Sequence, residues 1–244
     1  MTTTAPSPIV LGPIRTERWD NVLAIDLTPA APELLIGRGN QLPRASLVVT
    51  SAARSIIDGS RAGEKVRTIV VTGTNGDPSL HPGLREISEN LVTLHNKWYP
   101  RAKLAILSDG RQLENPDVRR ALGYYDRPTI TMEWGSAKGF TRMTGCKGPE
   151  LARRVHALAG LEKLHVEINF VRGPVDNTSD AELKGIIKRL VEIRPAAIEI
   201  LTSTASVSGK RLKPFTPKQM DVLADTLAEA TGLKVSLYSE SSPV

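Results

Sequence analysis

Short runs of aliphatic and β-branched residues alternate along the chain with longer segments in which apolar residues recur at helical spacing. Runs of the first kind, bounded by Gly, Pro, Asn or Asp, are typical of strands, and the longer period is typical of amphipathic helices. The pattern predicts strands at 21–27, 67–72, 103–107, 129–134, 163–171, 197–201 and 234–238, and helices at 47–57, 82–99, 116–124, 148–161, 179–193 and 217–230. Six or seven β/α units therefore follow one another, which favours a parallel sheet with right-handed crossovers.

Helix ends carry recognisable signals at two places. Ser179 and Glu182 have the spacing of a capping box at the start of one helix, and Gly232 is placed to close the last one.

The length of 244 residues fits one α/β domain. We expect this domain to cover 12–240, between a disordered lead-in at 1–11 and a tail at 241–244.

Polar residues at alternate strand positions decide between an open sheet and a barrel. Strands of an open doubly wound sheet are apolar on both faces, whereas a barrel has one face toward a lumen that tolerates polar side chains. One face of four strands is polar here, as the period-two sets show: Val22, Ala24 and Asp26; Thr129, Thr131 and Glu133; His165, Glu167 and Asn169; Ala197, Glu199 and Leu201. The pattern favours a barrel.

Four acidic groups, Asp26, Glu133, Glu167 and Glu199, are expected at mid-strand positions that face one interior, with His165 and Asn169 beside them. Buried charges of one sign must be neutralised, hydrated or paired. These charges could be compensated by a water-filled cavity or a bound cation. A basic side chain could also pair with them, and the candidates are Lys138, Arg142, Arg172, Lys210 and Arg211. Alternatively, each glutamate pairs with a neighbouring Lys or Arg and takes no part in chemistry.

The charge, aromatic content and cysteine count of the chain argue against several classes of function. The net charge of +6 is spread along the chain and only 4% of residues are aromatic, so a nucleic-acid footprint is not expected. A single cysteine, Cys146, excludes an internal disulfide and any all-cysteine metal site from this chain alone. We expect a cytoplasmic protein without a membrane segment, and no metal site is predicted.

Several motifs in order resemble the radical S-adenosylmethionine (SAM) superfamily. They read GPIRTER at 12–18, LAIDLTP at 23–29, TGTNGDPSLHP at 72–82, LSDG at 107–110 and VRGPVDNT at 171–178. The third is similar to the glycine-rich loop, with its Glu-Pro, that follows the family's second strand. The likeness extends over most of the chain from Gly12 onward.

The resemblance implies a partial (β/α)6 TIM-like barrel with SAM held across the carboxyl ends of parallel strands. By carry-over, Gly73, Gly76 and Asp77 would face the methionine amino group, and Ser108, Asp109 and Arg172 would lie near the nucleoside. The strand-end groups Glu133, Glu167, Asn169 and Glu199 complete the predicted cofactor site, since carboxylates favour a sulfonium. For the glycine loop alone, a tight turn that caps the next helix is an equal alternative.

The departure from the family concerns its iron–sulfur cluster. Family members have a C-x-x-x-C-x-x-C segment after the first strand, but the matching stretch 31–38 reads APELLIGR here. Because thiolates supply most of the cluster's binding, we expect no ordinary cluster and no reductive cleavage of SAM. Cys146 is expected to be a small buried hydrophobe.

Two functions remain open. The first is a cluster-free protein that binds SAM or a related nucleoside in a polar pocket at the barrel mouth. It would be a pseudoenzyme with respect to radical chemistry, and whether it catalyses another reaction is left open. The second is a non-catalytic partner or scaffold subunit of another enzyme complex. An ordinary metal- or phosphate-using barrel enzyme is least favoured, since no paired histidines and no phosphate-binding P-loop occur; a lone His165 remains a candidate general base.

Overall fold

The computed structural model describes residues 8–29, 42–173, 176–202, 206–207, 210–211, 213 and 215–238. Its contacts divide the chain into two compact units, unit 1 at 1–128 and unit 2 at 129–243, and each is described by itself. Three expectations from the sequence lie outside the described residues: most of the lead-in, the stretch 31–38 matched to the cluster segment, and the tail 241–244.

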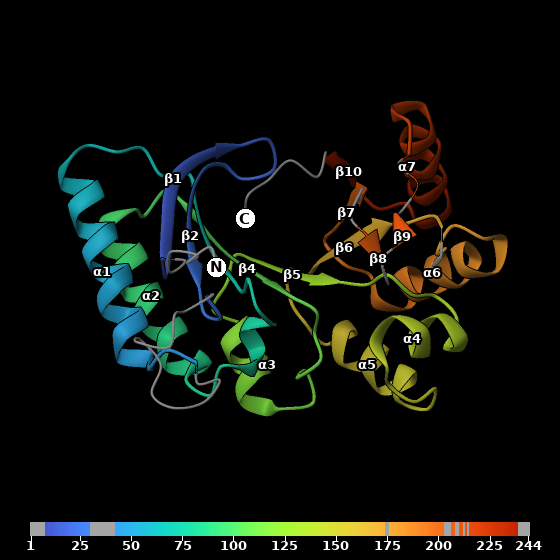
Figure 1. The fold of residues 1–244 in the computed structure, drawn as a ribbon, viewed down its shortest axis with the longest axis horizontal. Coiled ribbons are helices and arrows are strands. Elements are labelled where there is room, and N and C mark those ends of the chain that lie inside the picture. Colours follow the sequence, from blue (N-terminus) through green and yellow to red (C-terminus); the bar gives the residue numbers. More distant parts are fainter. Residues whose placement is uncertain are drawn as a thin grey trace. The chain divides into compact units, whose positions relative to one another are not determined.

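Unit 1 is a sheet with helices between its strands (Figure 1). Strand β1 runs antiparallel to β2, while β2, β3 and β4 are parallel neighbours. Its strands are β1 (Val10–Thr16), β2 (Asp20–Asp26), β3 (Thr68–Thr72) and β4 (Lys103–Ser108); its helices are α1 (Ala45–Arg61), the 3-10 turn η1 (Pro78–Leu80), α2 (Leu84–Trp98) and α3 (Pro116–Leu122).

Unit 2 repeats the alternation, and its strands β5, β6, β7 and β10 are parallel neighbours. A two-stranded antiparallel hairpin, β8 with β9, precedes the last helix. The strands are β5 (Arg127–Thr131), β6 (His165–Phe170), β7 (Ala197–Thr202), β8 (Ser206–Val207), β9 (Lys210–Arg211) and β10 (Val235–Tyr238); the helices are α4 (Ala137–Thr144), α5 (Glu150–Ala159), α6 (Asp180–Ile193) and α7 (Pro217–Thr231).

Within unit 1 the strands follow one another in the order β1-β2-β3-β4, and within unit 2 in the order β5-β6-β7-β10. Nearly every neighbour is also the next strand in the chain, and a helix joins each parallel pair, as expected of successive right-handed β/α units. The predicted α/β class with parallel strands is confirmed, and the order is consistent with a partial TIM-like barrel. Within the described residues, no helix combines the length and the apolar character needed to cross a bilayer.

The middle of one face of the unit 1 sheet is apolar. Val22, Ala24, Val70 and Ala105 form a buried cluster closed by Trp19. At the amino end of β3 the same face carries Thr68, which donates to the Trp19 carbonyl, and at the carboxyl end of β2 period-two alternation brings in Asp26, which is 2% exposed. The candidate chemistry of unit 1 is therefore confined to the strand ends.

The polar face of unit 2 extends further along its strands. Glu167 of β6 pairs in register with Glu199 of β7 and with Thr131 of β5, so these side chains lie on the same face. Both glutamates are buried. The alternate positions Val166 and Ile198 are fully buried on the opposite face, as the sequence predicted.

Two strand predictions need correction, and both move acidic residues. Strand β5 ends at Thr131 rather than at 134, so Glu133 lies beyond the strand and not at its middle. Asp26 is the last residue of β2, again not a mid-strand position. The apolar Ile130, Met132 and Trp134 continue the alternation past the last ladder pair, which is why periodicity overestimates the strand.

Other differences concern elements that the pattern did not reveal. Strand β1 begins at Val10, inside the predicted lead-in, because Gly12 and Pro13 interrupt its alternation. Helix α4 was missed, since Ala137–Thr144 contains Gly139 and only Phe140 is buried. At α6, Ser179 is the N-cap but makes no side-chain capping bond, so the predicted capping box does not form. Gly232 does close α7, in the left-handed conformation.

Candidate functional site

In unit 1, Asp77 joins the loop after β3 to the end of β4. One carboxylate oxygen accepts the Ser79 N–H at 2.8 Å and the Ser108 hydroxyl at 3.0 Å, and the other accepts the Asp109 N–H. Burial, partly opposed by these hydrogen bonds, raises the pKa of Asp77, and the Asp109 charge adds to the rise. Asp77 thus acts as a clamp between the loop after β3 and the end of β4.

The glycine loop is fastened to the end of β2 by two short side chains. Asp26 Oδ1 accepts the N–H groups of Thr28 at 2.8 Å and Thr74 at 3.1 Å, and Thr28 Oγ1 donates to the Gly76 carbonyl at 3.0 Å. A Cβ at Gly73 would lie 2.1 Å from the Gly76 carbonyl oxygen, so only glycine fits there. Asp26 Oδ2 is buried and has no hydrogen-bond partner among the described residues.

In unit 2, the buried glutamates lie in a network on one face of the sheet. His165 Nδ1 lies 2.6 Å from Glu199 Oε1, and the Thr131 hydroxyl donates to Glu167 Oε1 at 3.3 Å. Like charges directly opposite on neighbouring strands are destabilising, so such partners are needed for Glu167 and Glu199. The structure brings these predicted residues together, with His165 as a further member.

The pKa of the Glu133 carboxyl is strongly raised. Burial and the charge of Glu167 raise its pKa to about 7, although a hydrogen bond from the Asn169 side chain opposes the rise. Glu133 also lines a cavity of about 260 Å³ in unit 2, whose other walls include Lys138 and Arg142 of α4. A half-buried carboxyl with a pKa raised toward neutrality beside a cavity is a recognised mark of a functional site.

Two residues that the sequence reasoning did not assign to the site, Asn177 and Glu182, shape this region. Asn177 donates to the carbonyls of Asn169 at 2.8 Å and Glu133 at 3.2 Å and accepts the Val171 N–H at 2.9 Å. Its position in the motif at 171–178 was the available signal. Glu182 of α6 accepts the N–H groups of Gly135 and Ser136, both at 3.1 Å, and so ties α6 to the start of α4, whose N-cap is Ser136.

The ten predicted cofactor residues are divided between the units, five in each. Gly73, Gly76, Asp77, Ser108 and Asp109 meet at the strand ends of unit 1. In unit 2, Glu133, Glu167, Asn169 and Glu199 share one polar region, whereas the Arg172 guanidinium stacks on Phe215 at 4.7 Å. Asp109 binds the Arg111 side chain, with 2.6 Å between Oδ2 and Nε.

Comparison with known proteins places this geometry in context. No protein-family model matches the chain. A UPF0026 protein of Helicobacter pylori strain J99 is 23% identical over 250 residues, which cover 96% of this chain and 74% of the relative. The SAM-bound structure of Streptococcus suis SuiB matches with a TM-score of 0.58 and 10% identity, over 80% of this chain and 44% of SuiB.

A radical SAM methyltransferase from Sphaerobacter thermophilus matches with a TM-score of 0.53 and 12% identity, over 83% of this chain and 59% of that one. The fold is that of the radical SAM enzymes. The predicted resemblance is thereby confirmed at the level of the fold. The chain spans less than half of SuiB, which has also been solved with its precursor peptide SuiA.

The cofactors of radical SAM enzymes can be tested against the residues present. A cluster of the family's type needs three thiolates and the sequence contains one cysteine, so the donor set does not fit. Within the described ranges, no three acidic, histidine or cysteine side chains converge on a metal position. For SAM, an acceptor oxygen in each unit is buried and has no hydrogen-bond partner among the described residues, Asp26 Oδ2 in unit 1 and Asn169 Oδ1 in unit 2, and either would fit a cationic or hydroxyl-bearing group.

Proposed function

We propose that this chain is a cluster-free radical-SAM-like protein that binds SAM, or a related nucleoside, without radical chemistry. The observation that carries the proposal is Glu133, a half-buried carboxyl whose pKa is raised to about 7 and which lines a cavity together with Lys138 and Arg142. A group kept in so unfavourable an environment is typical of a binding or reacting position.

The cavity in unit 2 offers partners for a ligand that carries both signs of charge. SAM has a carboxylate, an ammonium, a sulfonium and ribose hydroxyls. Lys138 and Arg142 would hold its anionic group, and Glu133 would accept from a hydroxyl or attract a cation. A nucleoside without positive charge would gain less from the Glu133–Glu167 pair, so the sulfonium form is the preferred ligand.

The glycine loop of unit 1 supports the same proposal in a different way. Asp26, Thr28 and Asp77 fix its backbone before any ligand arrives, so the conformational entropy of ordering it is already lost. Because both oxygens of Asp77 are engaged, the loop's backbone carbonyls rather than that carboxylate would meet a ligand amine.

Calorimetric titration with SAM tests the proposal. We expect one SAM per chain, and about tenfold weaker binding by Glu133→Gln, which loses the charge but keeps the shape. Glu229→Gln, an exposed change of the same kind on α7, is the matched control and should bind as the parent does. Equal affinity of Glu133→Gln and parent, at unchanged stability, would remove Glu133 from the site.

The cluster-free part has a separate test. After anaerobic reconstitution the protein should stay colourless and hold no stoichiometric iron, because it cannot supply three thiolates. A brown protein with a full cluster would refute this part, whatever the result with SAM. We also place the protein in the cytoplasm, where one unpaired thiol stays reduced.

The second candidate is a non-catalytic partner or scaffold subunit of an active enzyme. The single cysteine favours it, since any cluster chemistry in such a complex would have to come from another chain. SuiB, a structural neighbour, is a protein solved with a bound peptide. No calorimetric signal with SAM, together with stoichiometric co-purification of a second protein, would favour the subunit role.

A further inference from the structure

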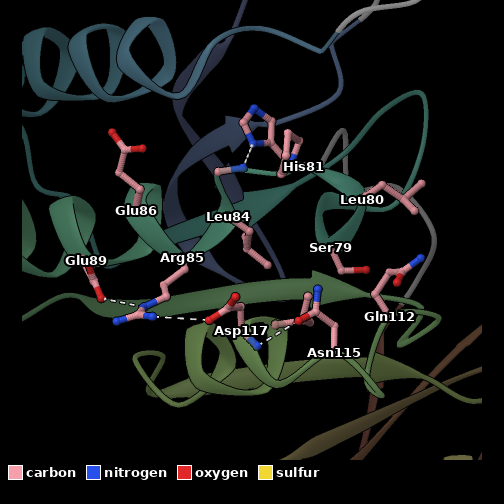
Figure 2. A pocket seen from close by; sticks show the side chains of 13 residues that line it. Ser79, Leu80, His81, Leu84, Arg85, Glu86, Glu89, Gln112, Asn115 and Asp117 are labelled. Atoms are coloured by element: carbon pink, nitrogen blue, oxygen red, sulfur yellow. Dashed lines mark hydrogen bonds and ion pairs between the residues drawn. The ribbon is translucent and has the colours of Figure 1, made fainter.

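A cavity in unit 1 provides a comparison for the cavity in unit 2. It has a volume of about 520 Å³ and is formed by η1, the first turns of α2 and the segment that leads into α3 (Figure 2). Its charged groups already pair with one another, since Arg85 lies 3.0 Å from Glu89 and 3.3 Å from Asp117. Figure 2 shows Glu86 directed away from them. The walls of this cavity therefore offer a charged ligand little.

The basic side chains of the unit 2 cavity are in a different state. Lys138 and Arg142 both line it from α4, and both are exposed. Neither side chain makes a hydrogen bond or an ion pair with any residue that the structure describes. The charge of Arg142 is felt by Glu182, whose pKa it helps to lower, whereas Lys138 has no such neighbour. Two cations are thus available to an anionic group in the cavity.

An acidic side chain with a free oxygen lines the same cavity. Asp176 is half-buried, and its Oδ1 accepts the Thr178 N–H at 2.8 Å and the Thr178 hydroxyl at 2.7 Å. Its Oδ2 has no partner among the described residues. Glu182, also a lining residue, is different, because both of its oxygens accept hydrogen bonds from Gly135 or Ser136. Asp176 is therefore the carboxylate that can receive a donor.

Charges of both signs line this cavity without neutralising one another. A simple anion would meet the carboxylate of Asp176, and a simple cation would meet Lys138 and Arg142. A ligand that carries an ammonium and a carboxylate would satisfy both groups through charge-assisted hydrogen bonds. The volume of about 260 Å³ lies below the usual range for drug-sized ligands, roughly 300 to 1,000 Å³, so it suits one small group.

We infer that the unit 2 cavity holds an α-amino acid group, whose ammonium contacts Asp176 and whose carboxylate contacts Lys138 and Arg142. Met143, a further lining residue, supplies apolar surface for the side chain of that amino acid. The inference rests on the proposed function in taking this cavity as the ligand site. In SAM the group is the methionine end, and the nucleoside extends out of the cavity. Glu133 is then left for the sulfonium.

Two fragments of SAM test the inference, L-methionine and methylthioadenosine, the second of which lacks the amino acid group. Each is titrated into the isotopically labelled full chain. We expect L-methionine to shift the amide resonances of Lys138, Arg142 and Thr178 saturably, and methylthioadenosine to leave them unchanged. Shifts of these amides by methylthioadenosine would place the nucleoside in the cavity and overturn the assignment. No saturation with L-methionine would overturn it as well.

The outcome separates this inference from the proposed function. Saturation by L-methionine without a calorimetric signal from SAM would support the amino acid site and refute SAM as the ligand. One SAM bound per chain, with no response of these amides to L-methionine, would leave SAM binding in place and refute the amino acid site.

Two analogues assign the charges, N-acetyl-L-methionine without an ammonium and L-methioninamide without a carboxylate. Asp176→Asn keeps an oxygen for Thr178 and should bind L-methionine about tenfold more weakly than the parent, with unchanged affinity for N-acetyl-L-methionine. Lys138→Gln should lose affinity for L-methionine but not for L-methioninamide. A variant that weakens L-methionine and its matching analogue equally would refute that contact.

Asp180→Asn is the matched control, an equal charge change on the exposed first turn of α6 outside the cavity lining. It should bind L-methionine as the parent does. Equal weakening by Asp180→Asn and Asp176→Asn would reduce the effect to overall charge and refute the site, and so would undiminished binding by Asp176→Asn.

Discussion

Asp77 in unit 1 is a buried carboxyl near a strand end, and Glu133 in unit 2 is a half-buried one with opposite surroundings. Burial is the main cause that raises the pKa of each. Asp77, however, accepts hydrogen bonds from Ser79, Ser108 and Asp109. Glu133 faces Glu167 and has one side-chain donor, from Asn169, so its pKa rises to about 7.

The difference separates a structural carboxylate from one available to a ligand. A buried acceptor with all its donors in place would lose hydrogen bonds if a ligand displaced them, which costs free energy. A buried carboxyl beside a like charge is relieved when a cation or donor arrives. The hydrogen-bond donors around a carboxylate therefore say more about its role than its place in a sequence motif does.

Replacing Asp77 should have the largest effect on stability. Asp77→Ala leaves Ser79, Ser108 and Asp109 without their common acceptor, and we expect the free energy of unfolding to fall by about 3 kcal/mol. Asp77→Asn keeps one acceptor oxygen, so its free energy of unfolding should lie between those of the parent and of Asp77→Ala. Urea unfolding curves followed by circular dichroism measure this.

Asp58→Ala is the control for that experiment, because Asp58 makes only an exposed pair with Arg54 on α1. Its effect should stay below about 0.5 kcal/mol. If Asp77→Ala proved as mild as Asp58→Ala, Asp77 would not be a clamp, and the contrast with Glu133 would disappear.

Glu133 should instead make the protein less stable as the pH rises. Its pKa is about 7 in the folded chain and has the ordinary glutamate value of 4.5 in the unfolded chain, so between these values the unfolded chain loses the proton first and folding becomes less favourable. Glu133→Gln removes this penalty, and we expect it to be about 1 to 2 kcal/mol more stable than the parent at pH 8, after allowance for partial solvation.

The same pair of proteins should unfold alike at pH 4, where the parent carboxyl is protonated in both states. Thermal unfolding at several pH values tests the prediction. A stability difference that does not change with pH would show that Glu133 is ionised normally, and it would then resemble Asp77 rather than contrast with it.

Alternation along the chain was sufficient to predict most of the fold, because each β/α unit buries its own apolar stripe. Helix α7, with Gly232 at its end, and the shared face of Glu167 and Glu199 follow from local spacing alone. The order of family motifs added the loop around Gly73. That loop is held as a tight turn by Asp26 and Thr28.

What the sequence did not predict depends on contacts between distant segments. The end of β5 is set by where its partner β6 stops pairing, so the position of Glu133 outside the strand was not readable from Thr129 onward. The spacing of Ser179 and Glu182 is that of a capping box, yet Glu182 reaches a helix 46 residues away in the chain, at Ser136. Sequence spacing cannot distinguish a local partner from a distant one.

Replacing Glu182 should have the smallest effect on stability. This residue extends the comparison of Asp77 and Glu133 to a carboxylate at the start of a helix. Burial alone would raise its pKa, but hydrogen bonds from Ser136 and Gly135, with the charge of Arg142, hold that pKa below its ordinary value. Its stabilising contribution is therefore present above the unfolded-state pKa and is lost as the pH falls through the lowered folded value. Like Asp77, Glu182 is a carboxylate fixed by its donors.

Glu182→Ala removes the acceptor of the Gly135 and Ser136 N–H groups at the start of α4, and we expect a loss of about 1 kcal/mol at pH 7 that shrinks toward pH 3. Glu182→Gln, which keeps an acceptor oxygen but no charge, should lose less. Thermal unfolding at pH 7 and pH 3 measures both. A loss that is the same at the two pH values would mean that packing of the side chain against Gly139, rather than its charge, holds α6 to α4.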